Sequence, residues 1–308
     1  MAEHVKDIEE DASLPPELPP DQVPGVRNGP RAGGFHFVPR LRRAGDRVGM
    51  GAMRGYRFLR CVEAGGVARI VLTRPPLNIL NIAMMEEVAA ALTWAAGLSG
   101  LKAVLFAAGG KAFCAGVDVE DHRDDRVKPM LEAFHRIFRL LHDLDCPTVA
   151  AVQGAALGGG AELATFCDLV IASDAATLGQ PEIKVGVFAP IAVLHYPLRV
   201  GPHRALQLLL SGRVVGASEA LQIGLVDRVV PAETLAEAVE AELGRFTAQS
   251  AAVLRLTKRA VRQSLGLPFH VALSQLEDLY QYELMATEDA AEGLRAFAEK
   301  RRPVWADQ

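Results

Sequence analysis

The sequence predicts an α/β fold with a mostly parallel sheet, followed by a helical C-terminal region. Short apolar or β-branched segments at residues 67–72, 103–107, 148–152 and 169–172 alternate with helical segments, which is typical of strand–helix–strand units. Half of the 308 residues are hydrophobic and 23% are charged, so the chain can bury a large core. After residue 200 the sequence is mainly helical, and no repeat of about 20–50 residues is visible, which argues against a solenoid.

Three helices of the expected core follow from periodicity and small residues. Residues 82–96 are mostly good helix formers, with apolar positions every three or four residues. Residues 158–166 begin with glycines, and we expect a helix there as well. Residues 130–144 are amphipathic, and their apolar face consists of Met130, Phe134, Ile137, Phe138, Leu141 and Leu144.

Helix signals also mark the C-terminal part of the chain. The helix predicted at residues 203–210 ends before Gly212, a good C-cap. Thr234 and Glu237 have the spacing of a capping box and predict the start of a further helix. Two longer helices are expected at residues 251–265 and 269–286.

The first 53 residues differ in composition from the rest. Residues 3–21 hold seven acidic residues, residues 27–54 hold seven arginines, and residues 15–39 hold seven of the 18 prolines. With so little apolar content we expect a disordered tail or an over-extended gene start; a tail that docks a partner is the alternative. The predicted organisation is therefore an N-terminal extension (1–53), an α/β core (54–245) and a C-terminal helical region (246–308).

Composition argues against several function classes. The 33 Lys and Arg against 37 Asp and Glu give a net charge of −4, which disfavours broad coating of nucleic acid. No run of about 18 uncharged apolar residues occurs. The four cysteines are far apart, and the histidines form no H-x-x-x-H or H-E-x-x-H pattern, so no metal or disulfide site is predicted. We expect a cytoplasmic protein that binds neither nucleic acid nor a membrane.

Two glycine-containing segments follow predicted strands. Residues 113–118 form a small-residue turn, which is either a tight connection or a place where backbone N–H groups face a ligand. In residues 154–162, three glycines stand at a helix start, more than packing alone would require. Bare N–H groups at the positive end of a helix suit an anion or a polarised carbonyl oxygen. Neither the Walker A spacing nor the dinucleotide-binding spacing is present.

Two glutamates accompany these glycines. Glu162 lies in the first turn of the predicted helix, where it either complements the helix dipole or acts in catalysis. Glu182 follows 20 residues later, on a loop after a predicted strand. Two carboxylates in apolar surroundings, close to oxyanion-type donors, are suited to adding water to an activated double bond.

At this point the sequence resembles the crotonase, or enoyl-CoA hydratase/isomerase, superfamily over residues 56–305. The resemblance implies a spiral of ββα turns, a C-terminal helical trimerisation region and a coenzyme A thioester as substrate. It implies no separate cofactor, because coenzyme A is part of the substrate, and an assembly that is a homotrimer or a hexamer made of two trimers. The stretches that carry the resemblance are residues 74–81, 113–118, 153–162 with Cys167 and Asp168, 179–182 and 211–230.

The resemblance also implies roles for individual residues. The backbone N–H groups of Val117 and Gly159 would form an oxyanion hole for the thioester oxygen. Glu162 would orient and deprotonate water, and Glu182 would deliver a proton to the alpha carbon. Both glutamates are present, which favours a hydratase over isomerases that keep only one. Main-chain contacts to coenzyme A would come from Ala115, Gly116, Asp118, Val119 and Gly158.

One segment departs from the usual hydratase pattern. Ordinary hydratases follow the second glutamate with Pro-Gly-Ala-Gly-Gly and an arginine, whereas residues 186–197 carry bulkier side chains. Together with residues 74–85, this stretch is similar to the cyclohexa-1,5-diene-1-carbonyl-CoA hydratases of anaerobic aromatic degradation. We therefore expect hydration of an alicyclic dienoyl-CoA. The alternatives are a general short-chain enoyl-CoA hydratase, or an isomerase, decarboxylase or thioester hydrolase of the same fold.

Other features allow further hypotheses. His195 and Tyr196 either do acid–base chemistry, as in a decarboxylase, or serve structure, with Tyr196 and Pro197 capping a helix and His195 facing the core or an interface. A Clp-like serine peptidase would need a nucleophile near the helix start, and residues 158–162 contain no serine. An RNA-binding protein would need an exposed basic helix face. The candidates, which alternatively are solvated or touch coenzyme A phosphates, are Arg255, Lys258, Arg259 and Arg262.

Overall fold

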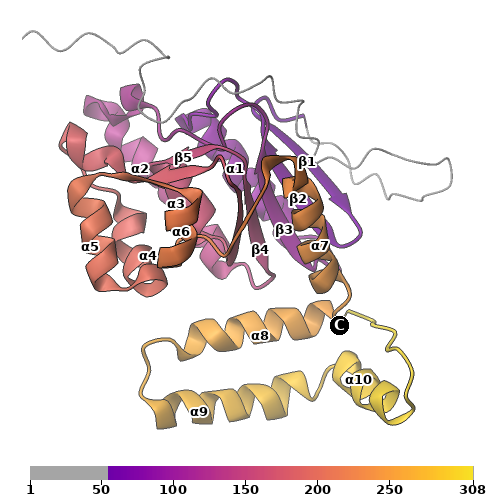
Figure 1. Ribbon diagram of the computed structural model, residues 1–308. Coiled ribbons are helices and arrows are strands. Elements are labelled where there is room, and N and C mark those ends of the chain that lie inside the picture. Colours follow the sequence, from indigo (N-terminus) through magenta and orange to yellow (C-terminus); the bar gives the residue numbers. More distant parts are fainter. Residues whose placement is uncertain (1–54, 308) are drawn as a thin grey trace, which may run out of the picture. The chain divides into compact units, whose positions relative to one another are not determined.

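A computed structural model describes residues 55–307 and contains an α/β fold with two sheets (Figure 1). The larger sheet has the strand order β1-β2-β3-β4-β6-β9, in which β1 is antiparallel to β2 and every other pair is parallel. Its strands are β1 (Leu59–Ala64), β2 (Val67–Leu72), β3 (Ala103–Ala108), β4 (Thr148–Val152), β6 (Leu169–Ser173) and β9 (Arg228–Val230). The smaller sheet consists of β5 (Ala155–Leu157), β7 (Thr177–Gly179) and β8 (Val214–Gly216).

The helices lie between and after these strands. Those of the first part are α1 (Ile82–Ala96), α2 (Val127–Asp143), α3 (Gly159–Phe166), α4 (Pro190–Val200), α5 (Pro202–Ser211) and α6 (Ala217–Ile223). Those of the C-terminal part are α7 (Leu235–Thr247), α8 (Ala251–Ser264), α9 (Phe269–Asp278) and α10 (Glu288–Ala298). Figure 1 shows α8 and α9 side by side.

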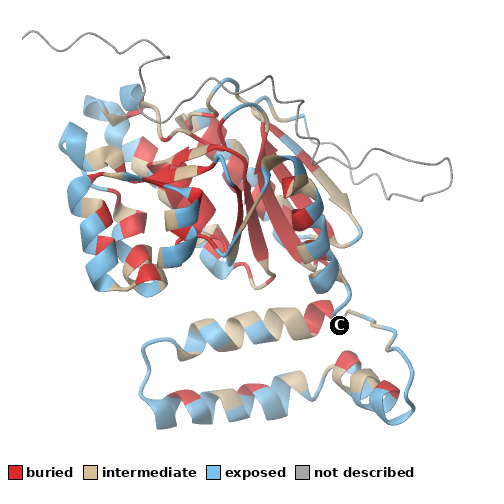
Figure 2. Cartoon of the chain, in the orientation of Figure 1, coloured by how far each residue is buried: buried red, intermediate tan, exposed pale blue. Residues whose placement is uncertain are grey.

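The central strands β2, β3 and β4 are buried on both faces and are mostly apolar, as is typical of parallel strands covered on both sides (Figure 2). Alternate residues of each strand point to opposite sides. Phe106 of β3 belongs to the main core, which includes the inner faces of α1 and α2. Leu105 belongs to a second cluster, in which Leu235, Val239 and Leu243 of α7 cover the other face.

Most predicted elements are confirmed. The predicted strands correspond to β2, β3, β4 and β6, and the parallel pairing of these strands is as expected. The helix predicted at residues 82–96 has the bounds of α1, and the apolar face predicted at residues 130–144 is buried. Gly212 ends α5 in a left-handed conformation with φ 59°, as a C-cap glycine should.

Two details of the helices differ from the prediction. Thr234 does not cap α7 through its side chain; its hydroxyl donates to the Pro231 carbonyl at 3.0 Å, within the short turn that precedes the helix. The helix expected at residues 269–286 is interrupted: α9 ends at Asp278, and Leu279–Leu284 forms a π-helical turn. The predicted division of the chain at residues 245–246 remains a prediction, and the predictions for residues 1–53 lie outside the described residues.

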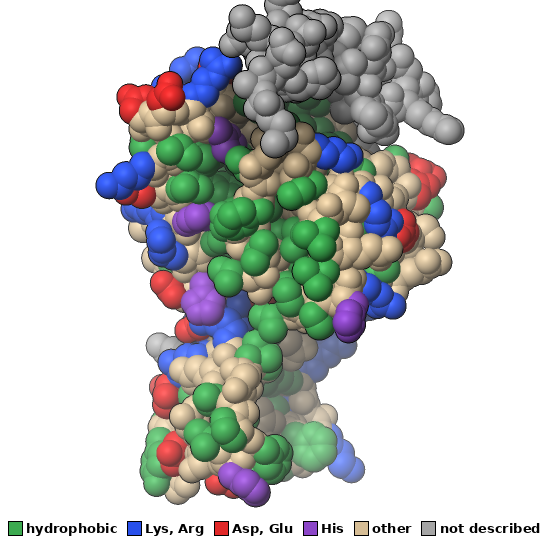
Figure 3. All heavy atoms as spheres, turned by 90° about the vertical axis from the view of Figure 1, so that its left-hand side faces the viewer, with side chains coloured by type: hydrophobic (Ala, Val, Ile, Leu, Met, Phe, Trp, Pro, Cys, Tyr) green, Lys and Arg blue, Asp and Glu red, His purple; other side chains and the backbone are tan. Residues whose placement is uncertain are grey.

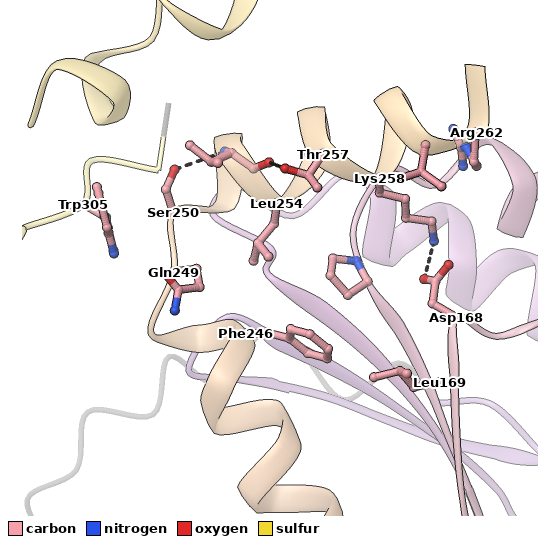
Figure 4. A pocket seen from close by; sticks show the side chains of 13 residues that line it. Asp168, Leu169, Phe246, Gln249, Ser250, Leu254, Thr257, Lys258, Arg262 and Trp305 are labelled. Atoms are coloured by element: carbon pink, nitrogen blue, oxygen red, sulfur yellow. Dashed lines mark hydrogen bonds and ion pairs between the residues drawn. The ribbon is translucent and has the colours of Figure 1, made fainter. Parts of the chain in front are cut away.

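Helix α8 is fixed to the core by charged contacts and covers an apolar pocket (Figure 4). Lys258 donates to the Asp168 carboxylate at 2.6 Å and to the Cys146 carbonyl at 3.0 Å. The pocket, of about 470 Å³, is lined by Pro147, Leu169, Phe246, Leu254 and Trp305 among others. Pro147 directly precedes β4, so the pocket lies at the amino end of this parallel strand.

None of the helices found in residues 55–307 is long and apolar enough to cross a membrane. Over the same residues, no group of three or more His, Cys, Asp or Glu side chains is arranged to hold a metal ion.

Candidate active site

The glycine-rich segment lies beyond the carboxyl end of β4, at the opposite end of the strand from the apolar pocket. It forms β5 and then enters α3 through Gly158, whose φ of 51° favours glycine. The Gly158 N–H donates to the Gly179 carbonyl at 2.9 Å. A Cβ atom at Gly158 would lie 2.5 Å from Glu182 Oε1. The turn therefore brings its backbone directly against the second glutamate.

The two glycines that follow are required by packing, contrary to the sequence-based expectation. A Cβ at Gly159 would lie 2.6 Å from Val117 Cγ2 and 2.9 Å from the Phe134 ring. A Cβ at Gly160 would lie 2.1 Å from the Cys114 carbonyl oxygen. Contacts between segments distant in sequence impose this requirement, and no local pattern reveals them.

Val117 and Gly159 lie against each other and have free backbone donors. Val117 forms an isolated parallel bridge with Leu80, in which the Leu80 N–H donates to Gly116 and the Asp118 N–H donates to Leu80, both at 2.9 Å. Among the hydrogen bonds of the described residues, neither the Val117 nor the Gly159 N–H has a protein acceptor. Gly159 is the first residue of α3, where unpaired N–H groups are expected.

Glu162 is buried in the first turn of α3, with 3% of its surface exposed. Its Oε1 accepts a hydrogen bond from the Ala192 N–H, at the start of α4, at 2.8 Å. Burial raises the pKa of Glu162 from 4.5 to about 8, the Ala192 hydrogen bond lowers it, and the charge of Glu182 raises it further. The carboxylate thus complements the start of α4, a helix distant in sequence.

Glu182 lies in the short 3-10 helix Pro181–Val185 and faces the same region. Burial raises the pKa of Glu182 above its ordinary value. Because two neighbouring carboxyl groups in an apolar site resist double ionisation, the titration of Glu162 and Glu182 belongs to the pair.

Of the residues predicted to contact coenzyme A, Gly158 lies at the start of α3, and the other four lie between β3 and α2. The Ala115 N–H donates to the Leu77 carbonyl at 2.9 Å, and Gly116 adopts φ 124°. The Asp118 carboxylate lies 3.7 Å from the Arg74 guanidinium and also accepts from the Glu120 N–H. The Val119 side chain is 68% exposed. The N–H groups of Ala115, Asp118 and Gly158 are thus already paired within the chain.

His195 and Tyr196 are adjacent in α4 but have different contacts. His195 Nε2 bonds the Thr165 carbonyl near the end of α3 at 2.7 Å, and burial lowers its pKa, so its contact is structural. Tyr196 lies inside α4, followed within the helix by Pro197, so the prediction that these residues cap a helix is wrong. Tyr196 is buried beside Gln180.

The four basic residues of α8 singled out in the sequence all contact polar groups of the same chain. Besides Lys258, Arg262 bonds the Asp145 carboxylate at 2.7 Å and the Leu144 carbonyl at 3.2 Å. Arg259 pairs with Glu283, and Arg255 donates to the Asp307 carbonyl at 3.2 Å. These contacts join α8 to neighbouring segments of the same chain.

Two groups at the site were not found from the sequence. The Ala192 N–H is a backbone donor and has no signal in the sequence. Gln180 stands two residues before Glu182, and its position in the motif was a usable signal: a polar side chain next to a functional carboxylate at the end of a strand. It is almost completely buried, with 1% exposed surface.

The chain matches the enoyl-CoA hydratase/isomerase family over residues 63–308. It belongs to this family. The crotonase resemblance and the α/β crotonase fold are therefore confirmed, and the chain is an enzyme of the enoyl-CoA hydratase family.

Several relatives are similar over most of their length. A cyclohexa-1,5-dienecarbonyl-CoA hydratase of Thauera aromatica is 39% identical over 246 residues, which cover 78% of this chain and 93% of that protein. A probable enoyl-CoA hydratase of Mycobacterium bovis is also 39% identical, over 240 residues, 77% of this chain and 93% of the relative. An enoyl-CoA hydratase subunit of Geobacillus kaustophilus superposes with a TM-score of 0.77 at 35% identity, covering 83% of this chain and all of that one.

Proposed function

We propose that this enzyme adds water to the double bond of an enoyl-CoA thioester, with Glu162 and Glu182 as the catalytic pair. The observation that carries the proposal is the arrangement of two carboxyl groups in a buried site, beside the unpaired N–H groups of Val117 and Gly159. Oxyanion donors act where negative charge develops, and each is worth about a hundred- to a thousandfold in rate.

Each group then has one step. The Val117 and Gly159 N–H groups hold the thioester oxygen as it gains negative charge. Glu162 accepts a proton from water while the water oxygen bonds to the beta carbon, and Glu182 gives a proton to the alpha carbon. The pair carries one proton before and after the step. The mechanism requires this proton to lie on Glu182, with Glu162 ionised, when water and thioester are bound.

We further propose an alicyclic dienoyl-CoA, cyclohexa-1,5-diene-1-carbonyl-CoA, as the preferred substrate. The support is the start of α4: Pro190 is its first residue, and the adjacent Ile191 is buried next to Ala192, the donor to Glu162. Bulky side chains at the start of α4 would change the shape of the pocket that holds the acyl group. Sequence identity does not separate the alternatives, because the Thauera and Mycobacterium relatives are both 39% identical.

The test is hydration of cyclohexa-1,5-diene-1-carbonyl-CoA and crotonyl-CoA side by side, followed by the mass of the product. A preference for the cyclic diene supports the narrower proposal, and a preference for crotonyl-CoA replaces it with a general short-chain hydratase. A product of unchanged mass indicates an isomerase, and release of free coenzyme A indicates a thioester hydrolase. Either of the last two results overturns hydration.

We also propose that the chain assembles as a homotrimer or as a pair of trimers. The side of the molecule that carries α4 and α5 has many hydrophobic side chains on its surface (Figure 3). Extended exposed apolar patches mark protein interfaces. The exposed residues of this patch are Ile183, Val185, Val187, Phe188, Val193, Leu194, Leu198, Leu206 and Leu210. The molar mass in solution, with Leu198→Asp as the variant expected to lower it, tests the assembly.

Cytoplasmic location and a part in the breakdown of aromatic compounds belong to the same proposal. All four cysteines are free and buried, which suits a reducing compartment. Growth of a deletion strain on aromatic acids, with the labelled protein followed by fractionation, tests both.

A further inference from the structure

Gln180 and Tyr196 form a buried chain of polar groups that ends at the Glu182 carboxylate. The Gln180 side chain lies between the Tyr196 hydroxyl, 2.9 Å away, and Glu182. The orientation of its amide follows from these neighbours, because an amide oxygen directed toward Glu182 would face two carboxylate oxygens. With Nε2 toward Glu182, Nε2 lies 3.2 Å from both carboxylate oxygens, and Oε1 accepts from the Tyr196 hydroxyl.

Because Gln180 and Tyr196 are buried, few hydrogen-bond partners are available to them. Gln180 and Tyr196 each have 1% of their surface exposed, so their polar atoms depend on hydrogen bonds within the protein. The Tyr196 hydroxyl has the Thr165 side chain as a partner besides Gln180. Burial raises the pKa of Tyr196, which keeps its hydroxyl protonated and able to donate. The Glu182 carboxylate also lies close to the Gly158 backbone, where a Cβ would be 2.5 Å from Oε1.

We propose that Tyr196 and Gln180 are positioning residues for Glu182: the Tyr196 hydroxyl fixes the Gln180 amide, whose N–H group holds the carboxyl that donates the proton. The inference rests on the proposed hydration by Glu162 and Glu182. It gives Tyr196 a function through Gln180 and no contact with the reacting atoms.

The arrangement also affects the titration of the glutamate pair. The ionisable groups around Glu182 are Glu162 from α3 and Tyr196 from α4. An N–H donor stabilises the ionised carboxylate, so losing the Gln180 donor makes the proton harder to remove. The active pair holds one proton, and activity falls at high pH when that proton is lost. The alkaline limb of the kcat profile is therefore expected at higher pH in the variants.

The test compares Tyr196→Phe, Gln180→Met and the double variant. Gln180→Met is expected to lower kcat by about tenfold to a hundredfold, as for the loss of a hydrogen bond to a charged group, and Tyr196→Phe by about tenfold or less. KM should stay within about twofold, and the alkaline limb should move to higher pH in both. Because Tyr196 acts through Gln180, the double variant should be no slower than Gln180→Met alone.

Ser173→Ala is the matched control. It removes another fully buried hydroxyl, which donates to the Gln153 carbonyl at 2.8 Å, and it should leave the alkaline limb in place. Tyr196→Phe deletes a single oxygen and alone decides the matter if Gln180→Met does not fold. The inference is overturned if the alkaline limb of Tyr196→Phe lies at the same pH as in the wild type. It is also overturned if the losses of kcat in the two single variants add up in the double variant. A Glu182→Gln enzyme with wild-type turnover instead overturns the proposed function.

Discussion

The Glu162 carboxylate accepts a hydrogen bond at 2.8 Å from the Ala192 N–H, although the residues are 30 positions apart. Ala192 lies in the first turn of α4, whose N-cap residue Ala189 offers no side-chain hydrogen bond. Glu162 therefore supplies the acceptor that a capping residue normally provides. The orientation of the proposed base and the start of α4 depend on each other, so substitutions near Pro190 act on both substrate fit and catalysis.

Replacing either glutamate by glutamine should abolish hydration without unfolding the protein. We expect kcat to fall by about 10²- to 10⁴-fold for Glu162→Gln and for Glu182→Gln, since each change removes one proton-transfer group. In Glu162→Gln the fold should persist because the amide oxygen of the new side chain can still accept from the Ala192 N–H. Steady-state hydration and thermal unfolding check both points. Glu237→Gln, at an exposed position of α7, is the control, and near-wild-type turnover in either test variant contradicts the assignment.

The buried Glu162 should also make folding stability depend on pH. Its pKa is about 8 in the folded state against 4.5 for the ordinary group, so the folded protein retains a proton that the unfolded chain loses. The stabilisation is complete below pH 4.5 and is lost as pH rises toward about 8. Denaturant unfolding between these limits should show a steeper loss for the wild type than for Glu162→Gln. Parallel curves would show that Glu162 titrates normally.

Local patterns were sufficient for the elements whose signals are local. The periodicity of residues 82–96 predicted α1 with its observed bounds, because one stripe of that helix is buried against the sheet. The three-residue strands β5, β7 and β8 were not predicted, since pairing between distant segments creates them and three residues carry no periodicity. The Thr234 capping box had the right spacing, but its hydroxyl found a nearer acceptor.

The same distinction applies to the candidate site. Glu162, Glu182 and the glycines were identifiable from motifs, because chemistry restricts the residue type at these positions. The contacts that define their environment were not, since Ala192 contributes only backbone and Tyr196 reaches Gln180 from another helix. The reason for Gly159 lies in Val117 and Phe134, which sequence alone does not bring to it.

Gly159→Ala and Gly244→Ala should have opposite effects on stability. A Cβ at Gly159 would meet Val117 Cγ2 at 2.6 Å and the Phe134 ring at 2.9 Å, whereas no atom lies within 4 Å at Gly244. We expect Gly159→Ala to lower the free energy of unfolding by about 1–3 kcal/mol. Gly244→Ala, inside α7, should raise it by about 0.5–1 kcal/mol.

The two variants should also differ in activity. A shift of Val117 or of the α3 start misaligns both proposed oxyanion donors, so kcat should fall by about a hundredfold or more in Gly159→Ala. Gly244→Ala should leave kcat unchanged. Urea unfolding and hydration kinetics on the same preparations measure both properties. A stable and fully active Gly159→Ala would remove the support for an oxyanion hole at this turn.

Lys258→Met should weaken the attachment of α8 and leave substrate affinity unchanged. Lys258 donates to Asp168 at 2.6 Å and to the Cys146 carbonyl at 3.0 Å, and its side chain is only 12% exposed. Removing the ammonium leaves these acceptors with fewer partners, so the free energy of unfolding should fall by about 1–3 kcal/mol. If Lys258 instead contacted coenzyme A phosphates, KM would rise steeply with ionic strength. Kinetics at low and high salt, with the exposed Lys128→Met as the control, separate the two roles.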